Sequence, residues 1–206
     1  RAVVHGQLGE AETAGLGHVT RSVALANTLV IEHVCLPENI QFITDGTPQV
    51  ARIIREAGYQ QTERPSDLAA AVAEQLQRWD QLPPAAFILD SMTHWHREEI
   101  LPLLHRKGTV SINLIDDPAN PSAPGDIVVN PLPRLTGAPS PGSATYLLGK
   151  DFFILHPDFL NVPRKPRTEG AATKAFAFFG GADGNHFSPI FLDAVAALPG
   201  LQWTQW

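Results

Sequence analysis

Residues 14–21 read Ala-Gly-Leu-Gly-His-Val-Thr-Arg, and they stand between a short apolar run and a long stretch with helical spacing of apolar residues. Gly15 and Gly17 have no Cβ, so the backbone can turn tightly and a ligand can approach it closely. The helix that follows points its free N–H groups and the positive end of its dipole at this turn. A phosphate-like or sugar-like ligand would therefore meet His18 here. A plain strand-to-helix turn without chemistry stays open, because short glycine motifs also occur in such turns.

Apolar runs alternate with helical periodicities along the first 130 residues. Strands are predicted at residues 2–4, 40–44, 86–90, 110–115 and 127–130. Helices are predicted at residues 19–34, 50–57 and 66–82, and a fourth around Ile100, Leu103 and Leu104. This rhythm is typical of βαβ units, so we expect an α/β protein with a Rossmann-like, mainly parallel sheet.

Polar side chains follow the predicted strands at their carboxyl ends. In open parallel sheets, ligands bind at this edge, where the strand order reverses. Some of these residues are expected there in any case, because strand ends meet solvent and aspartate caps helices. We therefore expect only two or three of them to be functional. Besides the glycine turn, they are His5, Asp45, Asp90, Asp116, Asp117 and Asn130.

The composition is that of an ordinary globular protein. Of 206 residues, 44% are hydrophobic and 17% charged, and the net charge is −6. The mild acidity argues against nucleic acid as the main partner. No apolar run approaches the roughly 18–20 residues of a membrane span, so we expect a cytoplasmic protein. The single cysteine, Cys35, cannot form an internal disulfide and is expected to be a packed residue.

Metal and cofactor sites have little support in the sequence. His94 and His96 are two residues apart, as in some metal sites, but no further Cys/His cluster accompanies them. The first glycine turn also lacks the third glycine of a dinucleotide-binding motif, since Thr20 occupies that position. We expect no metal and no cofactor.

A second strand, glycine turn and helix follow a linker. Residues 161–173 contain two prolines and several charged residues, residues 174–179 predict a strand, and residues 189–198 predict a helix. We therefore expect a domain at 1–160, a linker at 161–173 and the start of a second Rossmann-like domain at 174–206. One such unit of roughly 35 residues cannot build its own core, so a missing C-terminal part or a partner chain is expected to complete it.

Six segments in the same order resemble the PseG/SpsG-like proteins. The opening segment, residues 15–21 with Leu25 and Ala26, is similar to the G-x-G-H-hydrophobic-x-R…L-A of that family. The others are residues 88–90 ending in Asp90, residues 114–117 reading Leu-Ile-Asp-Asp, residues 127–130 ending in Asn130, residues 146–159, and residues 178–183 reading Phe-Phe-Gly-Gly-Ala-Asp. The chain departs from the family pattern after Asp90, at His156 and at His186.

The resemblance implies the two-domain GT-B fold of glycosyltransferases such as MurG. It implies a hydrolase of a UDP-linked amino or deoxy sugar in polysaccharide biosynthesis, with His18 as the catalytic base at the anomeric carbon. Such a residue must titrate near neutrality, as histidine does. The substrate would be held by Gly15, Gly17, Arg21, Asp90, Asp117 and Asn130. The diphosphate would lie at Gly180, Gly181, Asp183 and Asn185, while Arg21 could also contact a phosphate.

Two alternatives to hydrolysis remain open. A glycosyltransferase would use the same base with an acceptor hydroxyl or amine in place of water. A non-catalytic binding module would keep the fold and lack half of the site, which would apply if the chain truly ends at Trp206.

Overall fold

The computed structural model describes most of the first 160 residues and part of the remainder. The described residues are 2–7, 16–44, 47–63, 72–74, 76–77, 84–91, 97–116, 125–132, 144–160, 162–163, 176–179, 183 and 186–197.

Seven strands form a single parallel sheet in the order β3-β2-β1-β4-β5-β6-β7. They are β1 (Ala2–Gln7), β2 (Ile40–Thr44), β3 (Gln60–Glu63), β4 (Ala86–Ser91), β5 (Val110–Leu114), β6 (Ile127–Asn130) and β7 (Thr145–Leu148). The chain runs from β1 outward through β2 and β3, and then returns to the other side of β1 to add β4. The strand order therefore reverses between β1 and β4.

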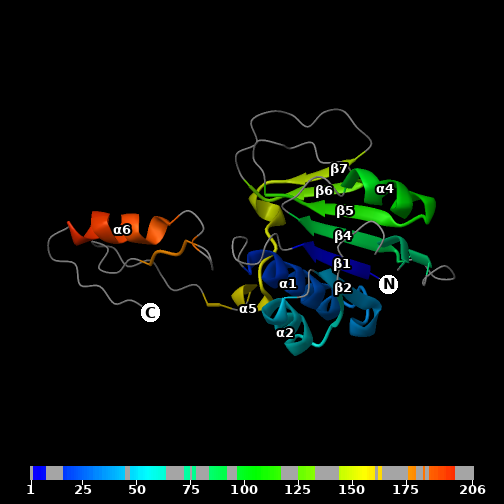
Figure 1. Ribbon diagram of the computed structural model, residues 1–206, viewed down its shortest axis with the longest axis horizontal. Coiled ribbons are helices and arrows are strands. Elements are labelled where there is room, and N and C mark those ends of the chain that lie inside the picture. The colour runs from blue at the N-terminus through cyan, green and yellow to red at the C-terminus, as the bar shows by residue number, and fades with distance from the viewer. Residues whose placement is uncertain are drawn as a thin grey trace.

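Helices cover both faces of this sheet (Figure 1). On one face, α1 (Gly17–Ile31) and α2 (Pro48–Glu56) pack on the sheet through a core that includes Val23, Phe42 and Ile88. On the other face, α4 (Arg97–Arg106) and the helical residues 72–74 and 76–77 pack on Phe87 and neighbouring side chains. The result is a three-layer α/β/α domain, and the predicted Rossmann-like parallel sheet is confirmed.

The predicted elements agree with the observed ones with small shifts of their ends. β2 has the predicted bounds, β1 is three residues longer, and α1 begins two residues earlier and ends three earlier than its predicted helix. Of the predicted helix at 66–82, residues 72–74 and 76–77 are described and are helical. β3 and β7 have no counterpart among the predicted strands.

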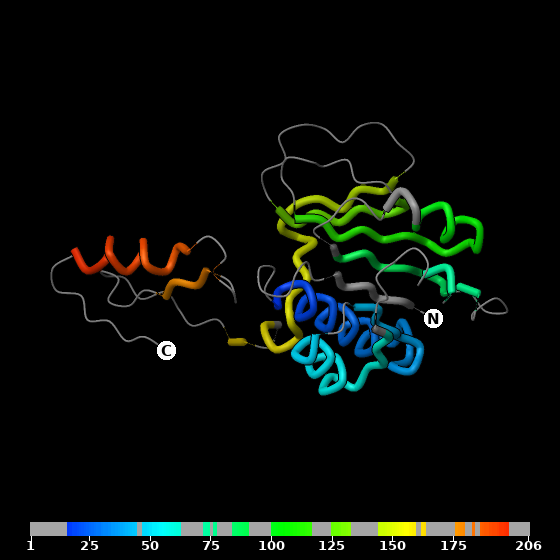
Figure 2. Tube along the Cα trace, in the orientation of Figure 1, coloured from blue at the N-terminus to red at the C-terminus, as the bar shows by residue number. Residues whose placement is uncertain are grey.

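Three short helical elements complete the described part of the chain. They are the 3-10 helices η1 (Pro37–Asn39) and η2 (Lys150–Phe152) and the single turn α5 (Pro157–Leu160). The Cα trace in Figure 2 shows α5 close to α1, where the two elements are in contact. Cys35 is a free, partly buried thiol that packs against the α1–β2 core, as predicted.

The C-terminal part differs from the prediction. Helix α6 (Phe187–Ala196) is present, but the described residues of the predicted strand at 174–179, Phe176 to Phe179, form no strand. A strand requires a hydrogen-bonded neighbour, and the predicted neighbour at 201–206 lies outside the described residues. Phe179 instead packs its ring against Phe187 and Phe191 of α6, with centroids 6.0 and 5.5 Å away.

Candidate functional site

A polar cluster lies where the strand order of the sheet reverses. Helix α1 follows β1 along the chain, and Asp90 lies near the carboxyl end of β4, where it pairs in register with Gly6 of β1. Asp90 and Ile88 are two residues apart on β4, so their side chains lie on the same face of the sheet. Ile88 belongs to the core beneath α1. The carboxylate of Asp90 therefore meets the first turn of α1.

His18 and Asp90 form the central contact of the cluster. Nδ1 of His18 lies 2.6 Å from Oδ1 of Asp90. The Asp90 side chain is 0% exposed and the His18 side chain 12% exposed. An ionised carboxylate can only accept at this contact, so Nδ1 of His18 is the donor, and in the neutral imidazole Nε2 then keeps its lone pair. The arrangement is that of an imidazole held in one orientation by an anion behind it.

Arg21 and Ser22 hold the other positions on the same carboxylate. Arg21 donates from Nη2 to Oδ1 of Asp90 at 2.5 Å and from Nε to Oδ2 at 3.0 Å. The buried hydroxyl of Ser22 donates to Oδ2 at 3.0 Å. Each oxygen of Asp90 thus accepts two hydrogen bonds, and a buried charge is tolerated when it is paired in this way.

The charges of the cluster support one another. Burial acts to raise the pKa of Asp90, but the hydrogen bonds from His18 and Arg21 and the charge of Arg21 outweigh it, and the pKa lies below its usual value. Burial likewise acts to lower the pKa of Arg21, and its contacts with Asp90 and Asp116 raise it above the usual value instead. Asp90 is therefore an anion and Arg21 a cation at neutral pH.

Asp116 extends the cluster toward solvent. It lies two residues beyond β5, and both of its carboxylate oxygens are 2.7 Å from Nη1 of Arg21. Its side chain is 45% exposed, against 18% for Arg21. The guanidinium of Arg21 therefore bridges a buried carboxylate and an exposed one.

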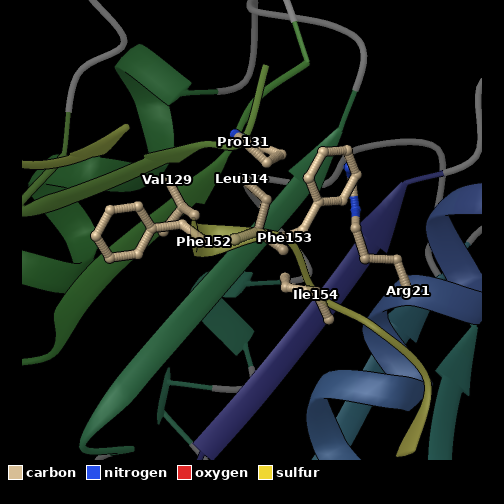
Figure 3. Close-up of a pocket in the computed structure, with 7 residues that line it drawn as sticks. All are labelled: Arg21, Leu114, Val129, Pro131, Phe152, Phe153 and Ile154. Atoms are coloured by element: carbon tan, nitrogen blue, oxygen red, sulfur yellow. The ribbon is translucent and has the colours of Figure 1, made fainter. Parts of the chain in front are cut away.

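Arg21 also lines a small cavity of about 60 Å³ (Figure 3). Its other walls are apolar and come from β5, β6 and the segment around η2. They are Leu114, Val129, Pro131, Phe152, Phe153 and Ile154. The cavity thus places an apolar surface next to the charged cluster.

The remaining predicted substrate residues have mixed outcomes. Asn130 is buried at the end of β6, and its side-chain oxygen accepts a hydrogen bond from the backbone N–H of Leu132 at 3.1 Å. Gly17 is the first residue of α1, and its φ is not positive. A Cβ added at this position would meet nothing within 4 Å. The described backbone therefore does not need a glycine at position 17. Gly15 and Asp117 lie outside the described residues.

Asp183 is the described member of the predicted diphosphate site. Its two carboxylate oxygens accept hydrogen bonds from the backbone N–H groups of Phe187 and Ser188, at 2.9 Å each. A hydrogen bond from the Ser188 side chain and the two backbone hydrogen bonds lower the pKa of Asp183. Asp183 thus caps α6 and occupies N–H groups that an anionic ligand would use. Gly180, Gly181 and Asn185 lie outside the described residues.

Ser22 is a member of the cluster that the sequence motifs did not indicate, although it lies four residues after His18 and so on the same side of the helix. Asp116 was recognised at the strand end, but Asp117 was preferred for substrate binding. In the structure it is Asp116 that contacts Arg21.

Metal binding finds no support in the part of the chain that the structure describes, where no three His, Cys, Asp or Glu side chains come together as ligands. His94 and His96 lie outside that part. None of the described helices is long and apolar enough to cross a membrane.

Comparison with known proteins leaves the family of this chain open. No model of a protein family matches it, and no curated protein does so either. Among solved structures it is similar to MurG of Acinetobacter baumannii, with a TM-score of 0.49 and 10% sequence identity over 67% of this chain and 43% of the MurG chain. The chain thus spans less than half the length of that protein. The fold class rests on the strand order described above, while the resemblance to the PseG/SpsG-like proteins and the two-domain arrangement stay predictions.

Proposed function

We propose that this protein processes a nucleotide sugar and cleaves a UDP-linked amino or deoxy sugar at its anomeric carbon, with His18 as the general base. The observation that carries the proposal is the 2.6 Å contact between Nδ1 of His18 and the buried Asp90 carboxylate. It leaves Nε2 of His18 as the proton acceptor, at the edge of the sheet where ligands of such folds bind. The sequence resemblance supplies the substrate class.

In the proposed reaction, Nε2 of His18 takes a proton from a water molecule. The water oxygen forms a bond to the anomeric carbon, and the bond between that carbon and the diphosphate oxygen breaks. Its electron pair leaves with UDP. Asp90 stabilises the imidazolium that forms, because it is an anion hydrogen-bonded to the opposite nitrogen. General-base catalysis of this kind contributes about 10²–10⁴-fold to a rate.

The UDP group is proposed to lie at residues 180–185, in the second unit of the chain. Gly180, Gly181 and Asn185 are the candidate contacts there. Asp183 is not included, since its carboxylate caps α6 and would repel a diphosphate.

A glycosyltransferase is the second candidate and differs only in what loses the proton to His18. The apolar cavity beside Arg21 supports this second candidate, because Arg21 contacts His18 and an organic acceptor could pack against the apolar walls. A water molecule would gain nothing from an apolar wall. An acceptor hydroxyl or amine held there would take the place of water in the reaction.

The test is UDP release from a panel of UDP-sugars by the purified protein, in water enriched in ¹⁸O. Release of UDP with ¹⁸O in the free sugar identifies a hydrolase. Release that requires an added acceptor and yields a glycosylated product identifies a transferase. A folded protein that binds UDP-sugars without releasing UDP would be a binding module and would refute the proposal.

A matched pair of variants tests the role of His18. His18→Asn is expected to lower UDP release by at least about 100-fold, since the base is lost. His33→Asn is the control, because His33 is exposed and lies beyond the other end of α1. Its positive φ of 57° is one that asparagine adopts readily. Equal activity of the two variants would exclude His18 as the base.

A further inference from the structure

We propose that Arg21 is a positioning residue, which acts on His18 through the Asp90 carboxylate and is itself held by Asp116, and that it is not a ligand of the substrate diphosphate. The proposal rests on the function assigned to His18 above. It departs from the sequence-based expectation that Arg21 contacts the substrate or a phosphate.

Every nitrogen of the Arg21 guanidinium already contacts a carboxylate of the cluster. Nε and Nη2 each donate to Asp90, and Nη1 lies 2.7 Å from both oxygens of Asp116. Nη2 also lies 3.1 Å from Nδ1 of His18. One guanidinium is thus shared by two carboxylates, and their negative charges would repel a diphosphate at Arg21.

The two-point contact fixes the plane of the Asp90 carboxylate. Arg21 reaches one oxygen with Nη2 and the other with Nε, the bidentate geometry that a guanidinium and a carboxylate favour. Ser22 adds a bond to Oδ2 from the neighbouring position of α1. Oδ1 is thereby directed at Nδ1 of His18.

The charge of Arg21 also decides which imidazole nitrogen is the base. Nδ1 of His18 faces both Asp90 and Arg21, and it can donate to the first or accept from the second. An anionic Asp90 requires a donor, so the proton stays on Nδ1. A protonated Asp90 would instead donate to Nδ1 and move the imidazole proton to Nε2, which would remove the base. Arg21 favours the anion.

Asp116 anchors Arg21 from the solvent side. Because both oxygens of Asp116 contact Nη1, the guanidinium is held at its outer end while its inner edge faces Asp90. Phe153 and Leu114 line the cavity beside it (Figure 3). Loss of Asp116 should therefore loosen Arg21 without removing the ion pair with Asp90.

The experiment reads the His18 tautomer directly by ¹⁵N NMR of the imidazole nitrogens. The signals of His18 are assigned by their loss in His18→Asn. The wild-type protein is expected to show the proton on Nδ1. Arg21→Met, which keeps an unbranched side chain that reaches as far as Nε but removes the charge and the N–H donors, is expected to populate the Nε2–H form. An unchanged tautomer in a folded Arg21→Met protein would overturn the proposal.

Two further variants keep the test decisive if Arg21→Met does not fold. Asp116→Asn leaves Asp90 paired, and it should lower kcat about 2- to 10-fold with KM for the nucleotide sugar unchanged. Arg21→Lys should restore part of the activity lost in Arg21→Met, since it restores the charge but not the two-point contact. In the Arg21 variants, a rise in KM for the nucleotide sugar, or in the Kd for UDP, with kcat preserved would identify Arg21 as a diphosphate ligand and refute the positioning role.

The two proposals fail in different ways. Wild-type activity in His18→Asn would refute the base role of His18, whatever the tautomer spectra show. A normal tautomer and a normal kcat in Arg21→Met would refute only the role of Arg21.

Discussion

Replacing Asp90 by asparagine should lower both the stability and the activity of the protein, and the structure gives the size of the first effect. The substitution keeps the shape of the side chain but replaces one oxygen by an NH2 group. In the unsubstituted protein, each oxygen of Asp90 accepts two hydrogen bonds, from His18 and Arg21 on Oδ1 and from Arg21 and Ser22 on Oδ2. Whichever oxygen is replaced, two donors lose their acceptor.

The expected loss of unfolding free energy is about 2–4 kcal/mol. Breaking a buried ion pair costs about 3–5 kcal/mol, and Arg21 keeps its bonds to Asp116, which reduces the loss. The assay is urea unfolding at pH 7, with the slope of the transition compared between the proteins. Asp116→Asn is the control and should lose less than about 1 kcal/mol, because the Asp116 side chain is itself 45% exposed.

A loss below about 1 kcal/mol in Asp90→Asn, or one equal to that of Asp116→Asn, would refute the reasoning. It would mean that the Asp90 carboxylate contributes no more than a surface charge. The contrast between the two variants is informative because both remove one negative charge from the same arginine.

Three further predictions concern pH and packing. The pKa of Asp90 is lower in the folded protein than in the unfolded chain, where it is about 4. The carboxylate therefore contributes its full stability above about pH 4 and loses it as the pH falls through the folded pKa. In acid, the stability of the wild-type protein should fall more steeply than that of Asp90→Asn. Urea midpoints across this range measure it. Phe42→Ala should cost about 3–5 kcal/mol in urea unfolding, because Phe42 is fully buried beneath α1 and α2. Gly125→Ala should cost about 1–3 kcal/mol, since φ is +147° and a Cβ would lie 2.4 Å from Nδ2 of Asn113. Gly58→Ala, where φ is +86° in open space, should cost about 1 kcal/mol and serves as its control in thermal unfolding.

The strands that the sequence predicted with their observed bounds, β2 and β6, are apolar strands with a neighbour on either side. Residues 40–44 read Ile-Gln-Phe-Ile-Thr, and all but Gln41 are buried. β3, in contrast, reads Gln-Gln-Thr-Glu and lies at the edge of the sheet. It is placed by pairing with β2, where Gln61 and Gln41 side chains bond to threonines of the neighbouring strand. Such long-range pairing has no local signature in the sequence.

The site could be predicted in part. The spacing of His18 and Arg21 on one helix placed them on the same side, and Asp90 was expected at a strand end. That these three side chains meet depends on β1 and β4 being neighbours, which only the strand order decides. The contact of Asp116 with Arg21 could not be predicted, because Asp116 follows the end of β5, where the alternation of a strand no longer fixes which way a side chain points.

The base role of His18 is tested most directly by chemical rescue. In His18→Gly, UDP release from the nucleotide sugar should fall by at least about 100-fold, and added imidazole should restore it in proportion to the concentration of its neutral form. Imidazole would then act as the proton acceptor in place of the missing side chain. UDP release that stays at the wild-type rate in His18→Gly, or that stays low at every imidazole concentration in the folded variant, would contradict the account.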